Sequence, residues 1–373
     1  MQFIDLAKQY AALKTDIDAN IHRVLARCSF VSGPENDELE RALAHYVGVK
    51  HALGVSSGTD ALLMPLLAWG IGAGDAVFTT PFSFFATAEV IALIGATPVF
   101  SDIDPHTFNI DPAKLRTTVE KTVAEGKLRP RAIIPVDLFG QCADYDEILR
   151  IADEYGLLVL EDAAQGFGAT YRGKKAGSFG HAAGTSFFPA KPLGCFGDGG
   201  AVFTDDADLA HTLRSIRVHG QGEDKYENVR IGINGRLDTL QAAVLLAKLA
   251  AFDSEIGRRN EVAARYTDHF SGHLTTPVVP ADNISVWAQY SLLAADAAER
   301  DAILGKLQAA EIPAAIYYAR PLHLQKAFAS LDYQAGDFPV AEDASQRIFS
   351  LPMHGYLEEA DVDAVAAAVL SAL

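Results

Sequence analysis

The chain has 373 residues, of which 49% are hydrophobic and 21% charged, and its formal net charge at pH 7 is −17. This length exceeds the size at which one hydrophobic core stops growing, so two domains are expected. The negative charge argues against nucleic acid or an anionic membrane as the partner, because the field of the protein repels polyanions. A small anionic ligand held by local arginines is still compatible with it.

The cysteines and the amino terminus predict a cytoplasmic protein. Cys28, Cys142 and Cys195 form an odd, scattered set without metal-ligand spacing, so we expect three free thiols, a reducing compartment and no bound metal. Residues 1–8 have neither the basic nor the apolar region of a signal peptide. No later apolar run is long enough to span a bilayer.

The first two thirds of the chain alternate between strand-like and helical patterns. An amphipathic helix ends near Cys28, and an irregular segment follows over residues 30–35. The expected strands are residues 51–57, 76–80, 97–104, 131–139 and 157–162, and the expected helices between them are residues 60–69, 83–94 and 144–155. The alternation predicts an α/β fold with a mainly parallel sheet covered on both faces. Ligands of such sheets bind at the carboxyl ends of the strands.

Two further strands, residues 184–188 and 200–204, are joined by too few residues for a helical crossover, so an antiparallel return is expected. A long helix after Asp238 leads into the last third, and we place the domain boundary near Phe252. The predicted domains are residues 1–252 and 253–373. The smaller domain is expected to contain strands at residues 285–294 and 314–318 and helices at residues 299–310 and 361–373.

Lys191 lies on the loop of this antiparallel return, between Phe188-Pro189 and Pro192-Leu193. Desolvation by apolar neighbours lowers the pKa of an ammonium toward the neutral amine that Schiff-base chemistry requires. A lysine whose stem covers apolar surface is the equally open alternative.

Three other stretches have the residues expected around a planar, phosphorylated ligand. Ser56–Asp60 stands at a strand-to-helix junction that can bind phosphate, or can simply cap the helix. Glu161 and Asp162 end an apolar strand and point to opposite faces, so one of them can meet a protonated ring nitrogen, or cap the next helix. The aromatics of Pro81–Glu89 can stack on a ring or belong to the core. Together with a reactive lysine, these features describe pyridoxal 5′-phosphate.

Five motifs, taken in order, resemble those of the DegT/DnrJ/EryC1/StrS family of sugar aminotransferases. They are Gly58–Asp60, Glu161–Gln165, Ser186–Gly194, Gly197–Gly200 and Gly232–Asp238. The resemblance begins at Phe3 and reaches Ser350–His354, so it covers nearly the whole chain. It implies the fold-type I architecture of pyridoxal-phosphate enzymes, with a large cofactor-binding domain and a smaller C-terminal α/β domain.

The resemblance also implies roles for individual residues. Lys191 would form the Schiff base and Asp162 would pair with the pyridinium nitrogen. Gln165 would contact the ring hydroxyl, Phe84 would stack on the ring, and Gly58, Thr59 and Ser186 would hold the phosphate. Asn234 would reach in from the neighbouring subunit, which implies a homodimer with shared active sites.

Within the family, the chain is most similar to members that aminate C3 of a UDP-linked 2-acetamido-3-keto-hexuronic acid, with glutamate as the expected amino donor. These enzymes act in polysaccharide and lipopolysaccharide biosynthesis. The similarity puts Phe30, Arg236, Tyr317, Tyr318 and His323 around the sugar nucleotide, although a packing role for His323 is as plausible. Phe30, Ala190 and Tyr317 replace other residues of those members, which leaves the exact sugar open.

Several alternatives stay open or are disfavoured. The acceptor can instead be a dTDP- or UDP-linked 3-keto- or 4-keto-6-deoxyhexose, and a non-catalytic pyridoxal-phosphate-binding regulatory protein is a rival from a different class. A sugar dehydratase is disfavoured because that activity goes with replacement of the lysine, and Lys191 is present. A Rossmann-type nucleotide-binding protein is disfavoured because no G-x-G-x-x-G follows the first expected strand.

Overall fold

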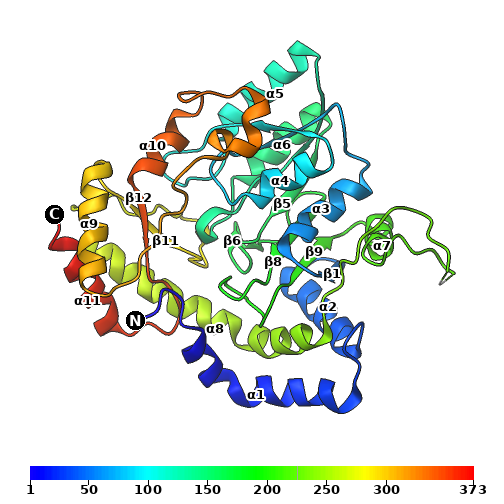
Figure 1. Ribbon diagram of the computed structural model, residues 1–373, viewed down its shortest axis with the longest axis horizontal. Helices are drawn as coiled ribbons and strands as arrows, with labels where there is room; N and C mark the ends of the chain where they lie inside the picture. The colour runs from blue at the N-terminus through cyan, green and yellow to red at the C-terminus, as the bar shows by residue number, and fades with distance from the viewer. Residues whose placement is uncertain (225) are drawn as a thin grey trace.

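The computed structural model describes residues 1–224 and 226–373. A seven-stranded sheet forms its centre, with helices on both faces (Figure 1). In spatial order the strands are β1 (His51–Val55), β9 (Gly200–Thr204), β8 (Ala182–Ser186), β5 (Leu158–Asp162), β4 (Arg129–Ile133), β2 (Asp75–Thr79) and β3 (Thr97–Phe100). β9 runs antiparallel to both β1 and β8, and the other neighbours pair in parallel. The predicted mainly parallel sheet and antiparallel return are confirmed.

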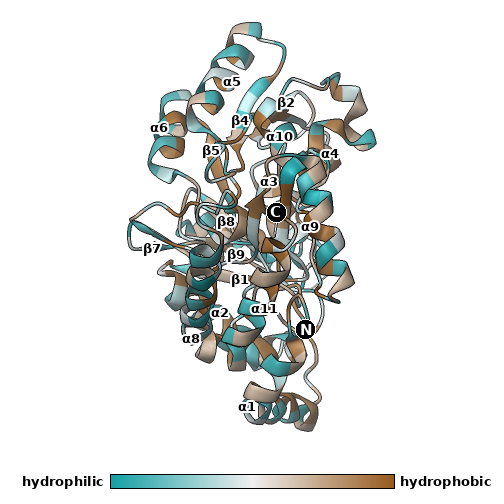
Figure 2. Cartoon of the chain, turned by 90° about the vertical axis from the view of Figure 1, so that its left-hand side faces the viewer, coloured by the Kyte–Doolittle hydropathy of each residue, from teal (hydrophilic) through white to brown (hydrophobic). Residues whose placement is uncertain are grey.

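Each face of the sheet is covered by its own hydrophobic core. One core includes residues of α2 (Pro34–Val47), α5 (Pro112–Glu125), α6 (Tyr145–Tyr155) and α8 (Thr239–Phe270). The other includes residues of α3 (Gly58–Ala68), α4 (Ala86–Leu93) and α7 (Ala207–Ile216). In β2, Ala76 and Phe78 belong to the first core and Val77 to the second, as the two-residue period of a strand requires. Peripheral helices such as α5 and α6 carry both hydrophilic and hydrophobic residues (Figure 2).

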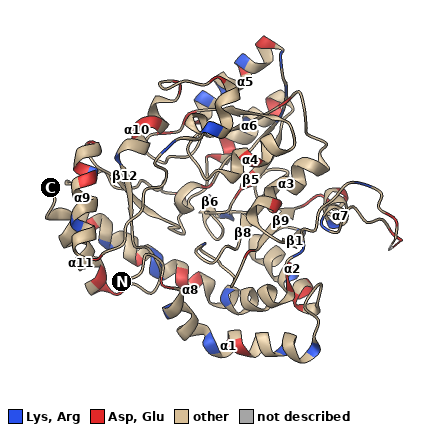
Figure 3. Cartoon of the chain, in the orientation of Figure 1, with Lys and Arg blue, Asp and Glu red and all other residues tan. Residues whose placement is uncertain are grey.

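Several helices begin at a residue whose side chain caps them. Asp111, Asp144, Asp206 and Asp296 each accept a backbone N–H bond at the start of a helix. α2, α5 and α7 were not among the predicted elements. In α5 the buried residues are Leu115 and Val119, so this helix has a weak apolar pattern and its caps are the stronger signal. Figure 3 shows that many of the charged residues lie on outer helices such as α5, α9 (Ala297–Ala309) and α11 (Glu359–Leu370).

The amino-terminal helix α1 (Leu6–Arg27) packs along α8, and it ends beside Cys28, as predicted. Ile17 of α1 shares a small buried cluster with Val244 and Ala247 of α8. All three cysteines are free, which the sequence also predicted. Among the described residues, no helix combines the length and apolar character needed to cross a membrane.

The carboxyl-terminal part has a separate core. Its elements are β11 (Tyr290–Leu293), α9 (Ala297–Ala309), α10 (Pro339–Arg347), β12 (Ile348–Leu351) and α11 (Glu359–Leu370), and β11 pairs antiparallel with β12. The strand predicted at residues 314–318 is wrong: Ala315 makes a single bridge to Ser350, and β12 is the true partner of β11. The domain boundary near Phe252 stays a prediction, since α8 passes through this residue without a break.

Short elements connect these parts. They are β6 (Thr170–Tyr171), β7 (Lys174–Lys175) and β10 (Asn283–Ile284), with the 3-10 turns η1 (Leu138–Gly140), η2 (Leu322–Leu324) and η3 (Lys326–Leu331). β10 pairs with β6, so the chain that follows α8 returns to the large domain before it enters β11.

Candidate active site

A cavity of about 430 Å³ opens where several strands end. The cavity is lined by residues at or just after the carboxyl ends of β1, β2, β5 and β8 and by residues of the loop between β8 and β9. The predicted site residues that line it are Gly58, Thr59, Phe84, Asp162, Gln165, Ser186, Lys191, Tyr317 and Tyr318, together with Ala190. This is the edge at which ligands of parallel α/β sheets bind, so the tertiary structure brings the separate motifs into one place.

The loop that carries Lys191 is a compact turn. The Lys191 N–H donates to the Phe188 carbonyl at 2.8 Å, and the Cys195 N–H donates to the Phe187 carbonyl at 2.8 Å. Burial lowers the pKa of Lys191, and the negative charge of Asp162 opposes this shift. The side chain therefore combines the position and the tendency toward the neutral amine that a nucleophilic lysine needs.

The acid pair at the end of β5 divides between the two faces of the sheet, as the strand period predicted. Asp162 lines the cavity and accepts a hydrogen bond from the Thr87 hydroxyl at 2.7 Å. Glu161 faces the other way and accepts the N–H groups of Gly177 at 2.6 Å and Phe179 at 2.8 Å. Burial raises the pKa of Asp162, whereas the Thr87 hydrogen bond and the charge of Lys191 lower it. Asp162 is thus the carboxylate available to a cation in the cavity.

One end of the cavity has the features of a phosphate cradle. Ser57 caps α3 by accepting the Asp60 N–H at 3.1 Å, so the capping alternative is correct for Ser57 and leaves the first N–H groups of the helix facing outward. Gly58 is close to β8: a Cβ there would lie 2.6 Å from the Ser186 Cβ. Only a residue without a side chain fits between this helix start and Ser186. These residues suit a phosphate.

Aromatic and amide groups form the other walls. Phe84 is 57% exposed and lines the cavity, so its ring is free to stack on a planar ligand. The Gln165 side-chain amide nitrogen donates to the Tyr318 hydroxyl at 3.1 Å, and its oxygen accepts the Phe139 N–H at 3.0 Å. Gln165 is therefore held rigidly by two partners, and its predicted contact with a ring hydroxyl stays a prediction.

Four predicted site residues do not line the cavity of the single chain. Phe30 and Asn234 are exposed and Arg236 is half-buried. His323 has a fully buried side chain that pairs with Glu342 at 3.1 Å and packs against Phe338, which supports the packing alternative. The sugar contact predicted for His323 has no support in this geometry.

Other residues in the wall were not among the predicted site residues. They include Ile4, Ser57, Leu62, Ser83, Phe188, Asp198 and Gln289. Gln289 comes from the carboxyl-terminal part, and its side-chain oxygen is buried without a hydrogen-bond partner among the described residues. No local motif marks Gln289, because it reaches the cavity through the packing of distant segments. Ile4 and Ser57 lie inside stretches that the sequence had already singled out.

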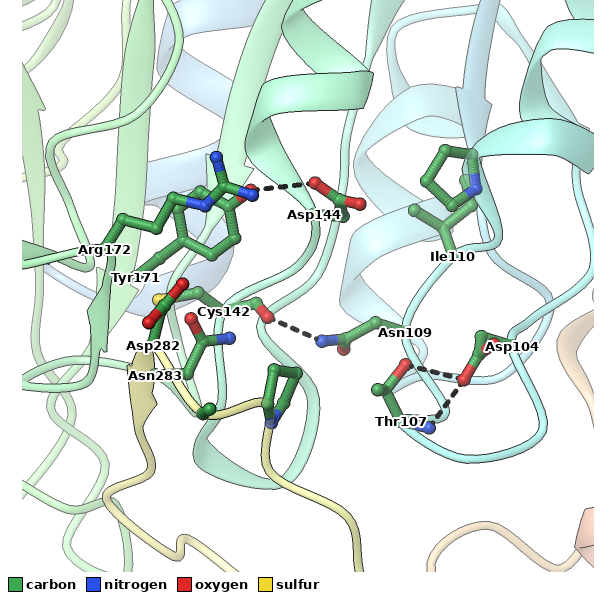
Figure 4. Close-up of a pocket in the computed structure, with 13 residues that line it drawn as sticks. Asp104, Thr107, Asn109, Ile110, Cys142, Asp144, Tyr171, Arg172, Asp282 and Asn283 are labelled. Carbon is green, nitrogen blue, oxygen red and sulfur yellow. Dashed lines mark hydrogen bonds between the residues drawn. The ribbon is translucent and has the colours of Figure 1, made fainter.

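A second cavity, of about 280 Å³, lies between the β6–β10 region and the segment around Asn109 (Figure 4). Its polar groups largely satisfy one another: Asn109 donates to the Cys142 carbonyl at 3.0 Å, and the Tyr171 hydroxyl donates to Asp144 at 2.8 Å. No lysine lines it. The cavity beside Lys191 is therefore the candidate active site.

Comparison with known proteins decides the family. Residues 11–370 match the DegT/DnrJ/EryC1/StrS aminotransferase family. The chain belongs to this family. A solved structure of a DegT DnrJ EryC1 StrS aminotransferase from Brucella abortus superimposes with a TM-score of 0.96 and 50% identity, covering 100% of this chain and 99% of that one. The predicted fold, aminotransferase activity and pyridoxal 5′-phosphate cofactor are confirmed.

Two relatives with nearly equal identity to this chain have names that describe different roles. The UDP-2-acetamido-2-deoxy-3-oxo-D-glucuronate aminotransferase of Pseudomonas aeruginosa is 46% identical over 370 residues, or 99% of both chains. The pleiotropic regulatory protein of Geobacillus stearothermophilus is 45% identical over 361 residues, or 95% of this chain and 94% of the relative. Relatives of nearly equal overall identity therefore include one named as an aminotransferase and one named as a regulatory protein.

Proposed function

We propose that this family member transfers an amino group from an amino acid, L-glutamate in our proposal, to C3 of UDP-2-acetamido-2-deoxy-3-keto-glucuronic acid in the cytoplasm. The observation that supports the catalytic role is that Lys191 and Asp162 line the same cavity at the strand ends. The Pseudomonas aeruginosa relative supports the choice of sugar nucleotide.

When bound, pyridoxal 5′-phosphate supplies a ring that accepts the electron pair released as the amino group changes carrier. Lys191 binds the cofactor and then moves the proton at the reacting carbon as a neutral amine. The Asp162 carboxylate keeps the ring nitrogen protonated by its charge, and Thr87 holds this carboxylate in place at 2.7 Å. Gly58, Thr59 and Ser186 would hold the phosphate, and Phe84 would stack on the ring.

An acidic acceptor sugar should be preferred over a neutral one. A UDP-linked 3-keto-hexuronic acid offers a carboxylate to the Arg236 guanidinium, which can bind it through two hydrogen bonds. A 4-keto-6-deoxyhexose has a methyl group at that place. A charge-assisted contact of this kind is worth about 1.5–3 kcal/mol, so we expect roughly ten- to hundredfold higher kcat/KM for the acid. The measurement compares both acceptors at a fixed glutamate concentration.

Arg236→Gln is the matched variant for this comparison. It should remove most of the preference for the acid while it leaves turnover of the neutral sugar nearly unchanged. Phe30, Ala190 and Tyr317 argue for a less polar sugar, because they replace polar contacts expected around the acid. A clear preference of the wild-type protein for the neutral 4-keto sugar would overturn the proposed acceptor and leave the aminotransferase assignment intact.

The sequence also left a non-catalytic regulatory role open, and the aminotransferase family assignment argues against it, although the Geobacillus stearothermophilus relative is named a pleiotropic regulatory protein. The intact set of Lys191, Asp162 and Gln165, which line one cavity, supports turnover. Conversion of the bound cofactor by glutamate, followed by return of its absorbance on addition of the keto sugar, supports the enzyme. Absence of both changes with all acceptors supports the regulator.

We also propose a homodimer in which each active site uses residues of both subunits. Asn234 and Arg236 lie outside the cavity of their own chain, after a loop that projects from the body of the molecule between α7 and α8 (Figure 1). On this loop Ile231 is 93% exposed and Val229 is 53% exposed, which is unfavourable unless another surface covers them. A second copy of the chain would bury both residues.

Mixing two impaired variants tests the shared site. Lys191→Ala should be inactive alone, and Arg236→Ala should keep about one to ten per cent of the wild-type kcat/KM on the acidic sugar. A hybrid dimer contains one site in which both residues are intact. Random exchange should restore roughly a quarter of the wild-type sites, since half of the dimers are hybrids and each has one good site of two. Subunit exchange is followed independently by native mass spectrometry. Exchange without recovered activity would contradict shared sites.

A further inference from the structure

Lys248 is a buried lysine that none of the roles above uses. It lies on α8 and is 2% exposed. Its ammonium donates a hydrogen bond to the Gly194 carbonyl at 2.6 Å and lies 4.7 Å from the centroid of the Phe196 ring. Gly194 and Phe196 both belong to the loop that carries Lys191, so the contact joins the long helix to the reactive loop.

The loop is tightly folded at the point where Lys248 holds it. A Cβ on Gly194 would lie 2.4 Å from the Pro189 carbonyl oxygen, so the chain before and after Lys191 is in close contact. Two residues further on, the Phe196 N–H donates to the Gln241 side-chain oxygen at 2.8 Å. α8 therefore fixes the loop at two points, through Lys248 and Gln241, and a shift of either point moves the segment that contains Lys191.

Burying the Lys248 ammonium for one hydrogen bond costs free energy. Burial lowers the pKa of Lys248 to about 8, and the charge of Glu255 opposes this shift. In the described part of the chain, the Gly194 carbonyl is the hydrogen-bond acceptor of this ammonium. An apolar side chain of similar volume would often pack at such a place without loss of stability. The cost is understandable if the position of the loop matters more than the stability of the fold.

We propose that Lys248 is a positioning residue for the aminotransferase reaction: it anchors the Gly194 turn to α8 and so holds Lys191 at the cavity. The proposal rests on the proposed role of Lys191. It requires no contact between Lys248 and the substrate or the cofactor. A displacement of about 1 Å in a reacting group can reduce a rate about a hundredfold, so loss of the anchor should act on the chemical step.

Hydrogen exchange in cofactor-free protein tests the anchor directly. In Lys248→Met, the backbone amides of residues 187–197 should exchange at least about tenfold faster than in the wild type, because the loop opens more often. Lys175→Met is the matched control: Lys175 is a partly buried lysine whose ammonium lies over the Tyr46 ring, and its hydrogen-bond partners are Tyr46 and Asp253. This control should leave exchange in the loop unchanged.

The donor half-reaction tests the positioning role. With glutamate and cofactor-loaded Lys248→Met, the single-turnover rate should fall about a hundredfold while the melting temperature and the KM for glutamate change little. Lys248→Gln, which lacks the charge and is shorter, is the second variant if Met does not fold, and it should change both measurements in the same direction. Wild-type exchange and wild-type half-reaction rate in a folded variant would overturn the proposal, as would faster exchange with an unchanged rate. Neither result affects the aminotransferase assignment, which wild-type turnover with glutamate tests separately.

Discussion

Replacing Lys191 with alanine is expected to lower turnover by about four powers of ten, on the order of 5 kcal/mol of barrier. The substitution removes the amine that binds the cofactor and that moves the proton at the reacting carbon. No other lysine among the described residues lines the cavity. The measurement is the single-turnover rate with glutamate in protein reconstituted with cofactor, and binding of the cofactor is checked by equilibrium dialysis.

Lys175→Ala is a suitable control for this variant, because Lys175 is also partly buried in the large domain and bonds to Tyr46 at 2.9 Å and Asp253 at 3.2 Å. It should keep wild-type turnover. In the wild type, borohydride reduction followed by peptide mapping should find the pyridoxyl group on Lys191. A pyridoxyl group on a different lysine would contradict the assignment of Lys191.

Asp162→Asn should retain the cofactor but lose about three powers of ten in turnover, or about 4 kcal/mol of barrier. An amide has no charge with which to keep the ring nitrogen protonated. The shape of the side chain is kept, and the Thr87 hydroxyl at 2.7 Å can still donate to the amide oxygen. The loss should appear in the rate constant of the donor half-reaction, with little change in the KM for glutamate.

Glu161→Gln is the matched control, since it makes the same chemical change on the neighbouring residue. Glu161 accepts the Gly177 and Phe179 N–H groups on the opposite face of the sheet, so we expect a loss of thermal stability with turnover per bound cofactor nearly unchanged. Near-normal turnover in Asp162→Asn combined with a large loss in Glu161→Gln would show that the two carboxylates have the opposite roles.

Much of the site could be predicted because its signals are local in the chain. The two-residue period of β5 is enough to separate Glu161 from Asp162, and the structure puts them on opposite faces as expected. The apolar residues that flank Lys191 and the short return between β8 and β9 are likewise properties of neighbouring residues. Local signals of this kind can be recognised in the sequence without knowledge of the rest of the fold.

Other features depend on residues that are far apart in the chain. Residues 314–318 have the residue types of a strand. However, β12 pairs with β11, and this segment makes a single bridge, between Ala315 and Ser350. His323 lies in a family-like segment, but Glu342 and Phe338 bury it away from the cavity.

The sequence by itself predicted the alternation of strands and helices that builds the sheet, put Lys191 and Asp162 among the candidate site residues, and contained the motifs that resemble those of the family. Only the tertiary structure decided that Gln289 enters the cavity wall and that Lys248 binds the carbonyl of Gly194, 54 positions earlier. The physical reason is that the strand period and the caps act between near neighbours, whereas burial and hydrogen bonding of a long side chain depend on which distant backbone the fold brings to it.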